Sequence, residues 1–147
     1  TYSALLSKGI NCKLVLAGEC KDSRFIQKIQ LMPGIQWLGP VSREELLDLV
    51  ASSKMMLNMS NSEVMPRTCL EALALGVPVL LPSGIPEFDE YCKEYVVCSA
   101  SAEHVALQIE DLLLRTPKQN YPIEDHLPQN VLIKYESLFR RLVNSNN

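Results

Sequence analysis

The chain lacks a paired cysteine motif, a basic run and a long apolar stretch, and each absence argues against a class of function. Its 147 residues include five cysteines, an odd number without a C-x-x-C pair, and only two histidines. Neither a disulfide framework nor a zinc site is indicated, and reduced, buried cysteines are expected. The net charge is −3, and no aromatic residues interleave with basic ones, so the sequence gives no electrostatic case for a nucleic-acid partner.

The composition is that of an ordinary globular domain. Hydrophobic residues make up 47% of the chain and charged residues 21%, and this length suffices for one domain with a real core, residues 1–147. No stretch has the character of a signal peptide or reaches membrane-spanning length. We therefore expect a cytoplasmic protein, although contact with a membrane surface through other parts of a longer protein stays open.

Short apolar runs alternate with amphipathic segments along most of the chain. Buried strands are predicted at residues 13–17, 35–38, 55–59, 77–81 and 95–98. Amphipathic segments between them predict helices, and this rhythm favours one parallel, doubly wound sheet of five strands with right-handed crossovers. Residues 116–128 contain three prolines and predict a loop, and residues 129–143 predict a closing helix.

The loop at residues 60–65 follows the third of these strands. In a β-loop-α-β unit such a loop lies at the carboxyl ends of the strands, where ligands bind. Glu63, Val64 and Met65 are therefore candidate ligand contacts. Gly18 turns the chain at the same edge after the first predicted strand; a lone glycine there is a weak signal, but Gly18 is kept as a candidate contact.

The helix after this loop is expected to begin at Pro66, because proline is favoured at the first helical position. The amides of Arg67, Thr68 and Cys69 would then lack intrahelical partners. Free amides, the positive end of the helix dipole and the Arg67 cation together make an anion site. The alternative is that a polar loop residue merely caps the helix and that Arg67 is solvated.

Glu71 interrupts a helix that is otherwise apolar nearly all round. A buried carboxylate is costly unless it is paired or hydrogen-bonded. Glu71 must therefore reach either a surface or a ligand.

Glu63 and Glu71 are separated by seven residues, and the helix leads into G-V-P-V at 76–79. This pattern resembles the E-x7-E signature of the retaining glycosyltransferases of family 4, in the C-terminal lobe of the GT-B fold. The resemblance extends over LVLAGE at 14–19, IQWLGPVSREEL at 35–46 and GIPE at 84–87. It implies an α/β fold with a Rossmann-like doubly wound parallel sheet. Because a helical pattern precedes the first predicted strand, we expect a single GT-B lobe, part of a longer protein, that lacks its first strand.

The resemblance also implies roles for individual residues. Glu71 matches the family glutamate that accepts hydrogen bonds from the ribose hydroxyls of the nucleotide. Glu63 matches the glutamate beside the donor sugar and is the candidate catalytic residue. Gly39 and Val41 match positions whose backbone lies against the nucleotide base.

The implied reaction transfers a sugar from a nucleotide-activated donor, such as a UDP- or GDP-sugar, with retention of configuration. The donor is a substrate, and no cofactor or metal is required. An N-terminal lobe would hold the acceptor, so the isolated segment is expected to be inactive. Two other classes stay open: a non-catalytic Rossmann-like nucleotide-binding module, and a GT-B epimerase that acts on a nucleotide sugar. The absence of G-x-G-x-x-G after the first predicted strand argues against a Rossmann oxidoreductase.

Overall fold

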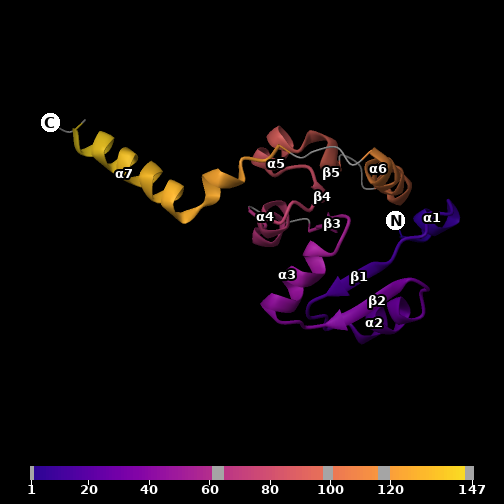
Figure 1. Ribbon diagram of the computed structural model, residues 1–147. Coiled ribbons are helices and arrows are strands. Elements are labelled where there is room, and N and C mark those ends of the chain that lie inside the picture. Colours follow the sequence, from indigo (N-terminus) through magenta and orange to yellow (C-terminus); the bar gives the residue numbers. More distant parts are fainter. Residues whose placement is uncertain (1, 61–64, 98–100, 116–119, 145–147) are drawn as a thin grey trace.

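The computed structural model describes residues 2–60, 65–97, 101–115 and 120–144, in which helices alternate with parallel strands (Figure 1). The strands are β1 (Leu14–Ala17), β2 (Ile35–Gly39), β3 (Met56–Leu57), β4 (Val79–Pro82) and β5 (Val96–Val97). The helices are α1 (Tyr2–Ser7), α2 (Ser23–Gln30), α3 (Arg43–Ala51), α4 (Arg67–Ala74), α5 (Pro86–Tyr91), α6 (Ala102–Arg115) and α7 (Pro128–Asn144), with short 3-10 helices η1 (Lys93–Tyr95) and η2 (Ile123–His126).

All the described strand pairs are parallel, but the strands form two sheets. β1 pairs with β2, with Leu14 opposite Ile35, and the second sheet has the order β3-β4-β5, with Met56 opposite Val79. The prediction of one five-stranded sheet was wrong in this respect. Within the described residues no strand pairs with both β1 and β3, so no hydrogen-bond ladder joins the two sheets.

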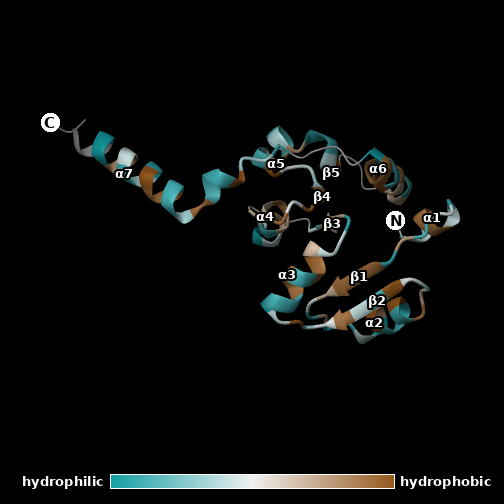
Figure 2. Ribbon diagram, viewed as in Figure 1, coloured by the Kyte–Doolittle hydropathy of each residue, from teal (hydrophilic) through white to brown (hydrophobic). Residues whose placement is uncertain are grey.

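The core is built around β4. Val79, Leu80 and Leu81 are fully buried, and they belong to the same buried cluster as Phe88 of α5 and Leu112 of α6. The first sheet is hydrophobic in Figure 2, yet the side chains of β1 are mostly only half-buried. The second sheet therefore supplies most of the apolar burial, and α4 packs on both β4 and α3.

Two helix starts follow local sequence rules. Asp22 caps α2, and its Oδ1 accepts hydrogen bonds from the amides of Arg24 and Phe25. Before α3, Ser42 Oγ accepts from the Glu45 amide at 3.2 Å, and Glu45 Oε2 accepts from the Ser42 amide at 2.8 Å. The S-x-x-E pattern of the sequence therefore forms a capping box, and it fixes where α3 begins.

The region predicted as a loop at residues 116–128 contains the 3-10 helix η2 in its described part. The prediction was wrong there, because Tyr121 is buried and holds this segment on the domain. The closing helix α7 begins at Pro128, one residue before the expected start, and extends away from the other elements (Figure 1). Large apolar side chains are exposed along it: Leu132, Ile133, Tyr135, Leu138 and Phe139.

Candidate functional site

Two of the predicted contacts meet at the carboxyl ends of β1 and β2. The amide of Gly18 donates to the carbonyl oxygen of Gly39 at 2.8 Å. Gly18 has φ 126° and Gly39 has φ 71°, a region of backbone conformation that favours glycine. Val41 follows Gly39 and is half-buried. The structure thus places all three predicted residues at one edge of the first sheet.

The helix that was expected to offer free amides begins one residue later than predicted. Pro66 is the N-cap of α4, with extended backbone and no side-chain cap, and Arg67 is the first helical residue. The Cys69 amide donates to the Pro66 carbonyl oxygen at 2.9 Å, so the prediction of a free amide was wrong for Cys69. Across the described ranges, the amides of Arg67 and Thr68 donate to no protein acceptor.

Glu71 lies on α4, and its carboxylate reaches both the surface and an ion-pair partner. Arg43 Nη2 donates to Glu71 Oε1 at 2.7 Å; the Glu71 side chain is 26% exposed and that of Arg43 is 74% exposed. No described residue donates to the other carboxylate oxygen, Oε2. Half of the Glu71 carboxylate is therefore available to another donor.

The carboxyl group of Glu45 helps to fix the start of α3, the helix that carries Arg43. The Ser42 amide, followed by the Ser42 hydroxyl, lowers the pKa of the Glu45 carboxyl below its usual value. Glu45 therefore stays ionised and holds the capping box at neutral pH. Arg43, which lies inside this box, begins the helix from a defined backbone position.

The segment after β4 is held by carboxylates of α5. The amide of Gly84 donates to Asp89 Oδ2 at 2.9 Å, and Tyr121 Oη donates to Glu87 Oε2 at 2.8 Å. His126 Nε2 lies 3.0 Å from the same Tyr121 oxygen. Met65 Sδ is 3.9 Å from that oxygen, so Tyr121 connects the residue before the N-cap of α4 to the segment after β4.

Burial of the Tyr121 side chain raises the pKa of its phenol well above the usual value, and the hydrogen bond to Glu87 raises that pKa further. The phenol is thus a proton donor over the physiological pH range. When it donates to Glu87, His126 in its Nε2–H form donates to the Tyr121 oxygen. Glu63 and Val64, the other predicted contacts in the preceding loop, lie outside the described residues.

A comparison with known protein families shows which family the chain belongs to. Residues 2–126 match the family described as Glycosyl transferases group 1. The chain belongs to this family. No curated protein sequence matches the chain at a significant level.

Among solved structures, this glycosyltransferase domain is similar to the crystal structure of AviGT4, described as a glycosyltransferase involved in Avilamycin A biosynthesis. The two share 22% sequence identity with a TM-score of 0.64. The alignment covers 97% of this chain and 47% of that chain, so the domain spans about half of the AviGT4 chain. At this identity the likeness concerns the fold, and it confirms the predicted α/β lobe of GT-B type.

Sequence reasoning missed two groups of residues in this glycosyltransferase domain. Arg43 is 28 positions before Glu71, and no spacing rule connects the first residue of one helix to the second turn of another. The cluster of Glu87, Tyr121 and His126 was missed because Tyr121 lies in a proline-rich stretch that predicts a loop. For Arg43 a signal existed: it directly follows the capping-box serine, after the predicted base contacts.

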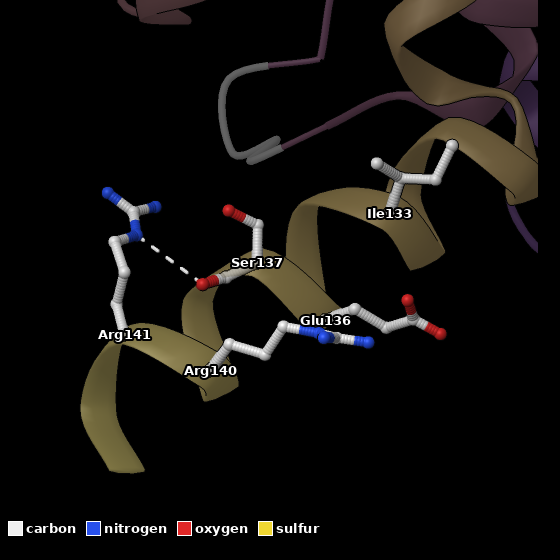
Figure 3. A pocket seen from close by; sticks show the side chains of 5 residues that line it. All are labelled: Ile133, Glu136, Ser137, Arg140 and Arg141. Carbon is white, nitrogen blue, oxygen red and sulfur yellow. Dashed lines mark hydrogen bonds between the residues drawn. The ribbon is translucent and has the colours of Figure 1, made fainter. Parts of the chain in front are cut away.

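A hollow beside α7 lies apart from the predicted residues. It has a volume of about 400 Å³, and Figure 3 shows its lining side chains, all from one helix: Ile133, Glu136, Ser137, Arg140 and Arg141. Arg141 Nε donates to the Ser137 carbonyl oxygen at 3.4 Å. Because a single exposed helix forms it, this hollow is an open feature of the surface.

The described residues contain neither a candidate metal site nor a candidate membrane-spanning helix. No group of three or more His, Cys, Asp or Glu residues is placed to hold a metal ion in the described ranges. No helix of that part of the chain has the length and apolar character that crossing a bilayer requires. Among the described residues, four cysteines form no disulfide: Cys12, Cys20, Cys69 and Cys92. Burial raises the pKa of the Cys92 thiol to about 11, so it is protonated at neutral pH.

Proposed function

We propose that this domain binds the nucleotide-sugar donor of a retaining, metal-independent glycosyltransferase of family 4 in the cytoplasm. The proposal rests on Glu71, whose carboxylate has one oxygen without a donor among the described residues, and on the start of α4, whose first two amides have no acceptor among those residues. Arg67 and Glu71 are four residues apart on α4 and therefore lie on the same face of the helix. A cationic, amide-rich helix start and a carboxylate acceptor thus share one surface.

The proposed chemistry follows from these charges. When the bond between the anomeric carbon and the diphosphate breaks, negative charge develops on the leaving group. The amides of Arg67 and Thr68, the helix dipole and the Arg67 guanidinium stabilise that charge without a metal ion. Glu71 accepts hydrogen bonds from the ribose hydroxyls, each worth roughly 1.5–3 kcal/mol to a charged acceptor.

The remaining candidate residues complete the donor site in this proposal. Glu63 orients the donor sugar and stabilises positive charge near the anomeric carbon, and Val64 and Met65 line the same loop. Gly18, Gly39 and Val41 provide backbone against the nucleotide. An N-terminal lobe of the same protein holds the acceptor, so this segment alone binds donor without transferring it.

A ligand screen tests the proposal. The melting temperature of the protein is measured with UDP, GDP, ADP and their sugars; one of them should raise it, because a ligand at 100 times its Kd stabilises the native state by about 2.7 kcal/mol. Glu71→Ala should weaken binding of that ligand about ten- to a hundredfold. Glu136→Ala, which removes an exposed carboxylate on α7, is the control and should bind normally. Absence of any shift would refute donor binding.

A second measurement separates transfer from the other classes. The full-length protein is incubated with the binding nucleotide sugar and candidate acceptors. A glycosylated acceptor supports the proposal. Release of a free epimerised sugar would indicate an epimerase, and binding without any product would indicate a non-catalytic module.

A further inference from the structure

The ion pair between Arg43 and Glu71 joins two parts of the proposed donor site. Arg43 is the first residue of α3 and follows Gly39 and Val41, whereas Glu71 lies on α4. The 2.7 Å contact therefore connects the helix after β2 to the helix after β3, and these two helices pack on each other. Both helices begin at the carboxyl edge of the strands, where a nucleotide binds in such folds.

The ion pair between Arg43 and Glu71 uses only one of the two carboxylate oxygens of Glu71. One nitrogen of Arg43 engages one oxygen of Glu71, and within the described ranges the second oxygen of Glu71 has no donor. A carboxylate can accept several hydrogen bonds, whereas a guanidinium can only donate. The pair therefore holds Glu71 in place and still leaves acceptor capacity for a ligand.

The contact between Arg43 and Glu71 contributes little to the stability of the fold. The Arg43 side chain is 74% exposed, and an ion pair with so exposed a cation adds little to stability. The backbone of Arg43 is nevertheless rigid, because Ser42 and Glu45 cap the helix from which it projects. A cation that projects from a well-fixed stretch of backbone, and that adds little to the stability of the fold, can hold another side chain in one orientation.

We propose that Arg43 is a positioning residue for nucleotide binding: it fixes Oε1 of Glu71 so that Oε2 accepts the ribose hydroxyls of a nucleoside diphosphate. This inference rests on the proposed function. An ordered carboxylate loses less side-chain entropy when the nucleotide binds, and pre-ordering of this kind increases affinity. A lysine carries the same charge but not the planar fork, so it restores only part of the effect.

A double-mutant cycle on the full-length protein tests the proposal. The Kd of UDP, GDP and ADP is measured by calorimetric titration for the wild type, and the tightest binder is then titrated against Arg43→Ala, Glu71→Ala and the double variant. We expect Arg43→Ala to raise Kd about three- to tenfold, as for coupled neighbouring residues. In the Glu71→Ala background the same change should have an effect of less than about twofold, because the group that Arg43 positions is gone.

Two further variants sharpen the test. Arg43→Lys should give a Kd between those of the wild type and Arg43→Ala, which a merely structural role would not predict. Arg115→Ala removes the same charge from the end of α6 and breaks the ion pairs of Arg115 with Glu94 and Asp111. It therefore controls for net charge and should leave Kd unchanged.

Each other outcome has a distinct meaning. Equal weakening by Arg43→Ala in both backgrounds would show that Arg43 contacts the ligand directly and would overturn the positioning role. Tighter binding by Arg43→Ala would show that the ion pair competes with the nucleotide and would overturn it as well. If Glu71→Ala binds normally, or if the wild type binds none of the three nucleotides, the proposed function itself fails.

Discussion

The phenol of Tyr121 donates to Glu87 Oε2 at 2.8 Å and so ties the chain before η2 to the first turn of α5. The Tyr121 side chain is 8% exposed, and its ring lies 4.8 Å from that of Phe88 between centroids. The ring of His126 stacks on that of Tyr121, at 5.4 Å between centroids. The last part of the family-matched region is therefore anchored to the segment that follows β4, next to Met65.

Replacing Tyr121 by Phe should destabilise the domain by about 1 kcal/mol. The ring and its packing on Phe88 remain, but the hydrogen bond to a charged acceptor is lost; because Glu87 is half-exposed, the loss lies toward the low end for such bonds. The free energy of unfolding in urea at neutral pH measures the effect. Tyr135→Phe, at an exposed position on α7, is the matched control and should change stability very little.

The same residue makes stability fall at alkaline pH. Burial raises the pKa of Tyr121 in the folded state above the value near 10 of an unfolded chain. Above about pH 10 the unfolded state therefore loses the phenolic proton while the folded state keeps it. Since the native state binds more protons there, the free energy of unfolding decreases as pH rises, by up to about 1.4 kcal/mol per pH unit for one group.

Urea unfolding of the wild type and Tyr121→Phe at a series of pH values from about 8 to 11 checks this direction. The wild type should lose stability more steeply than the variant above the unfolded pKa. Burial also raises the pKa of Tyr2 and Tyr95, so the variant keeps a residual slope. Identical slopes for both proteins would contradict the assignment of Tyr121.

Local rules in the sequence determine much of what was predicted correctly. The S-x-x-E pattern at Ser42 and Glu45 is a hydrogen-bonding unit that spans only four consecutive residues, and the structure contains it. The turn after α4 also follows its sequence, since Gly76 has φ 75° and the Val77 amide donates to the Ala72 carbonyl oxygen. Such features depend on neighbours in the chain and can be read without the fold.

The errors concern contacts between distant segments. The sequence predicts that the Glu71 carboxylate reaches a surface or a ligand, but its ion-pair partner Arg43 comes from another helix and was not predicted. Tyr121 is buried because α5 supplies an acceptor and an aromatic ring, neither of which is near it in sequence. The division into two sheets likewise depends on which strand edges meet, and residue periodicity within a strand carries no information on that.

Loss of the cap at Ser42 should destabilise α3. Ser42→Ala removes the oxygen that accepts from the Glu45 amide, and N-cap replacements of this kind cost about 1 kcal/mol. Ser42→Thr keeps the hydroxyl and should retain most of the stability. Thermal or urea unfolding of the three proteins measures the difference; equal losses for Ala and Thr would show that the serine packs rather than caps.

The last prediction concerns the hydrophobic core and compares two leucines of α6. Leu112 is 1% exposed and belongs to the buried cluster around β4, whereas Leu114, two residues later on α6, is 80% exposed. Leu112→Ala should lower the free energy of unfolding by about 2–5 kcal/mol, because it removes buried methyl groups and leaves a cavity in this cluster. Leu114→Ala makes the same chemical change in the same helix and should stay within about 0.5 kcal/mol of the wild type. Urea unfolding of both variants gives the comparison, and similar losses for the two would mean that α6 does not pack on β4 through the face that carries Leu112.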